Sequence, residues 1–362
     1  LHHALFSPEK RVGVVLLGRG QLGHRWLELM INEHQQLSQR TGFDFVLAGG
    51  VDKTKMWLDY AGLDASDLLS NFERQTIPKE EANLNQWLQH HPFDDLVIVD
   101  TTSSPDVVNY YEGFARYGFH IVSANTLVGA ASMETYRNIR DAFSKTGRHW
   151  LYSATLGGGL PVNYALRDLR NCGDKILGIS GIFSQALSWI FAHFDGSVSF
   201  SQLVEQAWQR DLFNDDPRKA LSGQEVAETL MMMIREAGYA IAAEDIRIEN
   251  LLPAELLDCS LDQFWQRLPK INAALEERRQ AARVLNLVLR YTARFSDNGK
   301  VKIGIDALPE ESTLAMHLPG ETLFLIESRW YRDGPLVIKG SAGRDALAGA
   351  LLSDLYSLAK LI

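Results

Sequence analysis

The sequence predicts an α/β protein with a doubly wound parallel sheet and a second domain of α+β type on a mixed sheet. Between Arg11 and Leu151, short apolar runs alternate with amphipathic helical stretches, as expected for parallel strands that helices cover on both faces. A glycine-rich turn follows the first of these runs. Beyond Gly159, strand-like runs alternate apolar and polar residues, which is typical of a sheet with one covered face.

In the first part, five continuously apolar runs are expected to be strands: RVGVVLL, FDFVLAGGV, DLVIVD, FHIVSA and HWLYSA. The stretch 21–39 between the first two should be a helix, because Leu22, Trp26 and Leu29 recur at helical spacing. Strands that alternate with helices in this way form parallel sheets. The first part therefore forms the doubly wound sheet.

In the second part, the expected strands are ILGISGIF, LVLRYTARF, KVKIGIDAL, LFLIESRWY and PLVIKG, with helices at 200–209 and 222–237. The charged stretch 261–285 predicts a solvated helix face rather than a binding patch. The last stretch, 343–362, predicts a helix that returns to the first domain. We therefore expect a first domain at 1–153, a second domain at 154–340 and a C-terminal helix at 341–362.

Charge and composition exclude several classes of protein. The 362 residues carry a net charge of −9, which argues against general binding to nucleic acid. No apolar run approaches the roughly 18 to 20 residues that cross a bilayer, and the start lacks the order of a signal peptide. The two cysteines, Cys172 and Cys259, are too isolated for a disulfide framework or a thiolate metal site, which fits a reducing compartment. We expect a cytoplasmic protein.

The glycine-rich turn contains Gly18, Gly20 and Gly23 in the spacing G-x-G-x-x-G, directly between a strand and a helix. In that context the first glycine permits a tight turn, the second lets the backbone approach a pyrophosphate, and the third allows close helix packing. The helix N-terminus then faces the anion. We predict a dinucleotide site that includes Gln21 and Leu22; the alternative is a plain tight turn.

An acidic residue at the end of the second strand, Asp52, is expected to hold the ribose of the dinucleotide. Lys53 and Lys55 follow it and suit a 2′-phosphate, which favours NADP over NAD, unless both are merely solvated loop residues. Open α/β sheets bind ligands at the carboxyl ends of their strands. Polar candidates at such ends are Thr102, Ser103, Ser123 and Asn125.

The chain contains, in order, the motifs LLGRGQLG, VDKTK, IVDTTSS, SANTLVGA, YSATLGGGLP, GISGIFSQALSW, DDPRKALSG, IESRWYRDGPLVIKG and AGRDALAG. Together they resemble the homoserine dehydrogenases, and more narrowly the C-terminal dehydrogenase half of fused aspartokinase/homoserine dehydrogenases of type II. The resemblance implies an NAD(P)-binding domain, a dimerisation and substrate domain, and a homodimer or higher homo-oligomer. It also implies that Leu1–Phe6 is a linker after a missing aspartokinase portion.

The activity that this resemblance implies is the NAD(P)-dependent interconversion of aspartate 4-semialdehyde and homoserine, in methionine and threonine biosynthesis. All four charged catalytic positions of the family are substituted. Thr126 stands in place of a lysine and Asn214 in place of a glutamate. Glu225 replaces an aspartate, and Thr229, one helical turn further on, replaces a second lysine. A threonine hydroxyl has no titratable proton near neutral pH, so the alkoxide lacks an evident proton donor.

Two further sets of residues follow from the resemblance. The turn in SATLGGGLP implies a site for a monovalent cation such as sodium, although a purely structural turn is the alternative. Its members are Ser153, Leu156, Gly158 and Leu160. The loop KGSAGRD, one residue shorter than in the family, contributes Gly340 and Gly343 near the nicotinamide.

Two functions remain open. The first is an active NAD(P)-dependent homoserine dehydrogenase in which another group, such as Lys219, donates the proton. The second is a catalytically inactive domain of the same fold that dimerises and stabilises a fused aspartokinase. An unrelated oxidoreductase is disfavoured, because the matching motifs extend through the second domain.

Overall fold

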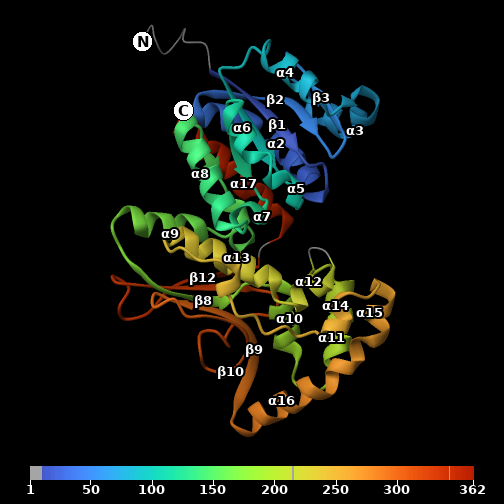
Figure 1. Ribbon diagram of the computed structural model, residues 1–362, viewed down its shortest axis with the longest axis vertical. Helices are drawn as coiled ribbons and strands as arrows, with labels where there is room; N and C mark the ends of the chain where they lie inside the picture. The colour runs from blue at the N-terminus through green and yellow to red at the C-terminus, as the bar shows by residue number, and fades with distance from the viewer. Residues whose placement is uncertain (1–9, 214–215, 342) are drawn as a thin grey trace. The chain divides into compact units, whose positions relative to one another are not determined.

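The computed structural model describes residues 10–213, 216–341 and 343–362 (Figure 1). Asn214 and the linker-like segment Leu1–Phe6 therefore lie outside the described residues. By its contacts the chain divides into two compact units, Leu1–Gly159 with Gly343–Ile362 (unit 1) and Leu160–Ala342 (unit 2). Within the described ranges, no helix is both long enough and apolar enough to cross a membrane.

The sheet of unit 1 has the strand order β4-β3-β2-β1-β5-β6-β7. Its parallel strands are β1 Lys10–Leu17, β2 Phe43–Val51, β5 Asp95–Asp100, β6 Phe119–Ser123 and β7 Trp150–Leu151. These are the five predicted strands. Two more, β3 Lys55–Leu58 and β4 Ile77–Pro78, add an antiparallel edge. They are too short to show a hydrophobic period, so the sequence did not predict them.

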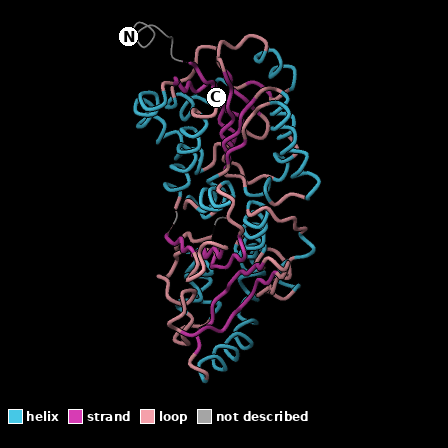
Figure 2. Tube along the Cα trace, turned by 90° about the vertical axis from the view of Figure 1, so that its left-hand side faces the viewer, coloured by secondary structure: helices cyan, strands magenta, loops and turns pink. Residues whose placement is uncertain are grey.

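Helices cover both faces of this sheet, so the doubly wound fold is confirmed (Figure 2). One face shares a hydrophobic core with α2 Gln21–Thr41, α3 Ala65–Gln75 and α17 Arg344–Leu358. Val97 and Val99 of β5 belong to that core. The alternate residues of β5 therefore face the other side. There α6 Tyr111–Arg116 packs on β6 and on α8 Met133–Thr146.

Shorter elements connect these layers. They are α4 Glu81–Leu88, α5 Pro105–Val108, α7 Thr126–Gly129 and the 3₁₀ turns η1 Ser153–Thr155 and η2 Gly157–Gly159. The predicted strand HWLYSA ends early at Leu151, because the chain turns at η1. A Cβ atom on Gly159 would lie 2.6 Å from the carbonyl oxygen of Ala346. The absence of a side chain there lets α17 pack closely against η2.

Unit 2 contains a five-stranded sheet of order β10-β9-β8-β11-β12. Its strands are β8 Ile176–Ile182, β9 Leu287–Ser296, β10 Val301–Pro309, β11 Thr322–Ser328 and β12 Leu336–Gly340. Each pair of neighbouring strands is antiparallel, so the second sheet, which was expected to be antiparallel or mixed, is antiparallel. Helices α9 Val162–Asn171, α10 Gln185–His193, α13 Gln224–Glu236 and α16 Asn272–Val284 pack against β8 or β9.

The remaining elements of unit 2 surround this helical layer. They are α11 Phe200–Gln209, α12 Pro217–Leu221, α14 Ala254–Leu257, α15 Leu261–Arg267 and the 3₁₀ turns η3 Ala243–Asp245 and η4 Leu268–Ile271. The single helix expected at 261–285 is divided between α15 and α16 by η4. Pro269 at the start of η4 explains the break, because proline lacks the N–H that a continuous helix needs.

A close contact at Gly23 generates our first prediction. A Cβ atom on Gly23 would lie 2.3 Å from the carbonyl oxygen of Gly18, so we expect Gly23→Ala to lower the free energy of unfolding by about 1–3 kcal/mol. The control is Gly20→Ala: no atom lies within 4 Å of its added Cβ and its φ is −70°. Urea denaturation should find this control within about 0.5 kcal/mol of the parent. Equal losses in both variants would contradict the close packing.

Candidate functional site

Four neighbouring parallel strands of unit 1, in the order β2, β1, β5 and β6, end at one edge of the sheet. The carboxyl ends of such strands form the ligand-binding edge of open α/β sheets. Many of the predicted site residues follow these ends in the chain: Gly18, Gly20, Gln21, Leu22, Gly23, Asp52, Lys53, Thr102, Ser103, Ser123, Asn125 and Thr126. The topology thus gathers residues that lie far apart in the sequence.

The glycine turn joins β1 to α2 and is held on two sides. Gly18 has φ +92°, in the region that favours glycine. Its N–H donates to the carbonyl of Val51 on β2 (3.0 Å), and its own carbonyl accepts from Thr101 Oγ1 (2.8 Å). Gly20 precedes α2, and no side chain caps that helix. The first N–H groups of an α-helix lack partners within the helix, so this end can receive a phosphate.

Asp52 is fixed in the turn after β2. Its Oδ1 accepts the backbone N–H groups of Thr54 (2.8 Å) and Lys55 (2.7 Å). Within the described part of the chain, Oδ2 accepts no hydrogen bond, and it is available to a ribose hydroxyl. Lys53 next to it is exposed.

Behind this edge lies a buried polar network centred on Asp100, the last residue of β5. Its Oδ1 accepts from the N–H (2.8 Å) and hydroxyl (2.7 Å) of Thr102, and its Oδ2 accepts from the hydroxyl of Tyr111 on α6 (2.7 Å). Ser123 Oγ lies 2.8 Å from the same Tyr111 oxygen. Asn125 joins the network by donating to Thr102 Oγ1 (3.2 Å). Three predicted residues are therefore oriented by two that the sequence analysis missed.

The electrostatics of the network follow from its burial. Asp100 and Tyr111 are both fully buried. Burial raises the pKa of Asp100, although the hydrogen bonds from Thr102 and Tyr111 oppose the shift. Burial also raises the pKa of Tyr111, and the nearby carboxylate adds to that effect. The sequence signal that could have identified Asp100 is an acidic residue directly after the apolar run 96–99 of β5.

Thr126, the first of the four positions that the resemblance implies are catalytic, begins the short helix α7. Asn125 precedes it, and the Asn125 side chain caps α7 by accepting the N–H of Leu127 (3.1 Å). Thr126 is partly exposed. A short polar side chain therefore stands at the ligand-binding edge where the family resemblance expects a lysine.

The proposed cation turn contains three successive glycines with positive φ, at 157–159. The N–H of Ser153 donates to the carboxylate of Asp354 on α17 (2.8 Å), and the carbonyl of Leu160 accepts the N–H of Val162 (2.8 Å). Across the described residues, no cluster of histidine, cysteine, aspartate or glutamate has the geometry to hold a metal.

Glu225 and Thr229 lie one turn apart on α13 of unit 2, and Thr229 Oγ1 donates to the carbonyl of Glu225 (3.0 Å). Between them Glu228, which the sequence analysis did not single out, is buried. Its Oε2 lies 3.7 Å from Nζ of Lys219 on α12, and its Oε1 accepts from Gln224 (3.0 Å). Burial raises the pKa of Glu228, while Lys219 and Gln224 oppose the shift. An acidic–basic pair thus adjoins Glu225 and Thr229 on α13.

The start of α12 is held by its own charged residues. Asp216 caps the helix by accepting the N–H of Arg218 (2.9 Å), and Arg218 Nε donates to the same carboxylate (2.9 Å). The Arg218 guanidinium also donates to the carbonyl of Leu257 (3.3 Å). These contacts restrain the helix that carries Lys219. Of the predicted nicotinamide residues, Gly340 ends β12 in unit 2 and Gly343 precedes α17 in unit 1.

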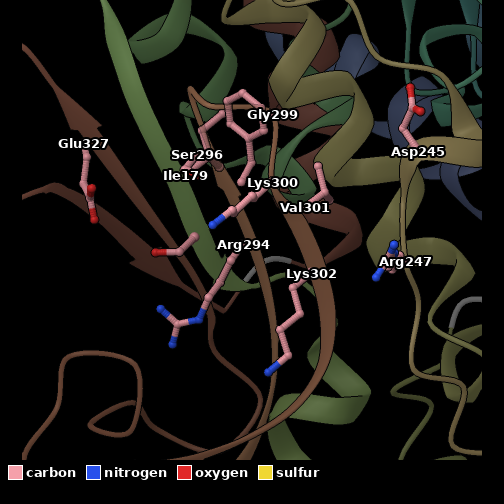
Figure 3. A pocket seen from close by; sticks show the side chains of 12 residues that line it. Ile179, Asp245, Arg247, Arg294, Ser296, Gly299, Lys300, Val301, Lys302 and Glu327 are labelled. Carbon is pink, nitrogen blue, oxygen red and sulfur yellow. The ribbon is translucent and has the colours of Figure 1, made fainter.

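Unit 2 also contains an open cavity of about 820 Å³ at the sheet (Figure 3). Its charged lining residues are Asp245, Arg247, Arg294, Lys300, Lys302 and Glu327. Arg294 and Lys302 both pair with Asp306 beside it, which holds the pKa of Asp306 at about 2 despite its partial burial. None of the residues predicted for the site lines this cavity, so it is separate from them.

The chain is similar both to family models and to individual known proteins. Residues 161–356 match the family model "Homoserine dehydrogenase", and residues 18–153 match "Homoserine dehydrogenase, NAD binding domain". The chain is 51% identical over its full length to "Bifunctional aspartokinase/homoserine dehydrogenase 2" of Escherichia coli, of which it covers 45%. It is 29% identical to a chloroplastic bifunctional aspartokinase/homoserine dehydrogenase 1 of Arabidopsis thaliana, of which it covers 40%. The chain therefore spans less than half the length of these relatives.

Solved structures share the fold. A Candida auris protein of unknown function aligns with a TM-score of 0.84 and 23% identity, over 97% of this chain and 99% of that one. A homoserine dehydrogenase from Thiobacillus denitrificans aligns with a TM-score of 0.74 and 19% identity, over 98% of this chain and 75% of that one. Both units of the chain thus have counterparts of the same fold.

The buried network generates our second prediction. The pKa of Asp100 in the folded protein lies above its ordinary value of 3.8. Its contribution to stability is therefore fully present below about pH 3.8 and is lost as the pH rises through the folded-state pKa. Asp100→Asn cannot titrate, so relative to the parent its free energy of unfolding should improve between about pH 4 and pH 7. Urea denaturation across this range measures the difference.

The control for this prediction is Asp141→Asn, which changes an exposed aspartate on α8. It should show no pH-dependent difference from the parent. Asp100→Ala should lose about 2–4 kcal/mol at low pH, because the Thr102 and Tyr111 donors are left without an acceptor. This loss should shrink as the pH rises, because alanine cannot titrate either. A flat difference between Asp100→Asn and the parent would contradict the raised pKa.

Proposed function

Because the chain belongs to the homoserine dehydrogenase family, we propose that it reduces aspartate 4-semialdehyde to homoserine with a reduced nicotinamide dinucleotide. The observation that supports this most is the glycine turn at the start of α2, where Gly18 and Gly23 make a close contact and the helix N-terminus is uncapped. The same chain carries the matched dehydrogenase region over 161–356.

The residues at the sheet edge fit a dinucleotide of the NAD or NADP type. Gly18, Gly20 and Gly23, with the N–H groups of Gln21 and Leu22, would hold the pyrophosphate. The Oδ2 atom of Asp52 would accept a ribose hydroxyl. The nicotinamide end would lie at the carboxyl ends of β5 and β6, where Thr102, Ser103, Ser123 and Asn125 are found, with Gly343 before α17. When bound, the cofactor supplies the hydride; the protein supplies its orientation.

Hydride addition to an aldehyde leaves an alkoxide that must gain a proton. The hydroxyls of Thr126 and Thr229 do not titrate near neutral pH. Lys219 is the charged donor next to the substituted positions, 3.7 Å from Glu228. We assign the proton donation to the Lys219 ammonium, which then recovers a proton from solvent. Glu225 provides a carboxylate for the ammonium of the amino-acid substrate.

The proposed function also includes a bound cation, a homodimer and an aspartokinase partner. The carbonyl oxygens of Leu156, Gly158 and Leu160, with the Ser153 hydroxyl, would hold a monovalent cation that stiffens the turn. Unit 2 would mediate a homodimer. Bifunctional relatives carry an aspartokinase in their names, and we propose that this domain acts together with such a portion.

A second function has specific support in the four substituted positions Thr126, Asn214, Glu225 and Thr229. Loss of both family lysines removes the cations that would stabilise an alkoxide, whereas the fold retains its cores. In this alternative the domain binds a dinucleotide, dimerises and stabilises an aspartokinase without turnover.

An activity assay separates these functions and is our third prediction. With aspartate 4-semialdehyde, the absorbance of reduced NAD or NADP should fall, and Lys219→Met should lower kcat by about 10² to 10⁴-fold with a small change in KM. Lys219→Arg keeps a cation opposite Glu228 but is too weak an acid to donate, so it should be as slow as Lys219→Met. An arginine variant as fast as the parent would exclude proton donation by Lys219.

The absence of turnover above background in the parent would favour the scaffold function. That function in turn requires a dimer, which sedimentation velocity at micromolar concentration measures. A monomer under those conditions would exclude the scaffold function.

A further inference from the structure

Two cationic side chains, Arg19 and Lys55, lie near Asp52, the acidic residue after β2. Both already interact with other groups of the protein. Arg19, inside the glycine turn, lays its guanidinium over the ring of Phe72 on α3, 3.8 Å from the centroid, and donates to the carbonyl of Leu68 (3.2 Å). Only 15% of the Arg19 side chain is exposed. Lys55 reaches from β3 toward α3. Both cations therefore converge on one helix.

The group that they share is the carboxylate of Glu73 on α3. Its Oε2 accepts a hydrogen bond from Lys55 Nζ (2.6 Å), and its Oε1 lies 3.7 Å from the guanidinium of Arg19. The hydrogen bond from Lys55 to Glu73 is the main reason that the pKa of Lys55 is raised. Burial lowers the pKa of Arg19, and Glu73 and Asp52 oppose that shift. One carboxylate thus compensates two cations.

The charges around Asp52 decide whether NAD or NADP binds better. A 2′-phosphate carries nearly two negative charges and needs free cations, whereas a ribose hydroxyl needs an acceptor such as a carboxylate. Asp52 offers that acceptor. Lys55 and Arg19 are engaged, whereas Lys53, which follows Asp52, is exposed and has no ion pair among the described residues. Two carboxylates also repel a phosphate.

We propose that Glu73 sets the cofactor preference of this site: by engaging Lys55 and Arg19, it weakens binding of a 2′-phosphate, and the site favours NAD over NADP. The inference rests on the proposed dinucleotide function. It reverses the preference that Lys53 and Lys55 suggest when they are read from the sequence alone. The difference arises because Glu73 lies 18 residues beyond Lys55 in the chain and meets it only in the fold.

Glu73→Gln tests the proposal with little change in shape. The glutamine oxygen still accepts from Lys55, but the negative charge is gone. Removing one charge close to a doubly charged phosphate is expected to tighten NADPH binding by roughly tenfold. Binding of NADH should stay within about twofold. The Glu73 side chain is 66% exposed, so the variant should fold like the parent, as circular dichroism can verify.

Titration calorimetry with NADH and NADPH gives both affinities directly, without any turnover. The control is Glu112→Gln, which removes the same charge from an exposed ion pair with Arg116 on α6 and should leave both affinities unchanged. Adding Lys55→Met to Glu73→Gln should abolish the gain for NADPH, because the cation whose charge Glu73 compensates in the parent is then missing.

Four outcomes decide between the hypotheses. Tighter NADPH binding in Glu73→Gln alone, lost again with Lys55→Met, supports the proposal. A parent that binds NADPH tightly over NADH overturns it, as does an unchanged ratio in Glu73→Gln. If the parent binds neither nucleotide, the dinucleotide assignment of the proposed function fails and this inference fails with it.

Discussion

The contact between α2 and β1 at Gly23 and Gly18 is the constraint on which the candidate site depends. The carbonyl oxygen of Gly18 lies 2.3 Å from the place where a Gly23 Cβ would be, so only glycine lets the helix begin so close to the strand. The same carbonyl accepts from Thr101 Oγ1 on the neighbouring chain segment. One close approach thus fixes the helix N-terminus relative to the ends of β1 and β5, where the other polar residues gather.

Much of the fold could be predicted, because hydrophobic period and glycine spacing are local signals. The five parallel strands, the glycine turn and the resemblance to homoserine dehydrogenases are all confirmed. The edge strands β3 and β4 were missed because they are only four and two residues long. The break at Pro269 was missed because the charged stretch 261–285 keeps a helical composition on both sides of it.

The sequence could predict site residues only where they belong to a local motif, such as the glycine turn. Asp100 was overlooked because its partner Tyr111 comes from a helix after the strand, and the bond between them depends on the packing of α6. Glu73 and Glu228 were overlooked for the same reason. Each is an ordinary helical glutamate in the sequence, and only the fold brings it close to a lysine on another element. Contacts between side chains on different helices and strands cannot be predicted from local sequence patterns.

The resemblance implies an aspartate at position 225 and a lysine at position 229, where this chain has Glu225 and Thr229 on α13. Carboxylates are present there at Glu225 and Glu228, and Lys219 on α12 lies 3.7 Å from Glu228. A lysine ammonium is a far stronger acid than an alcohol, so its proton moves downhill to an alkoxide. Under the proposed function, Lys219, which lies 3.7 Å from Glu228, can therefore donate the proton that neither threonine can.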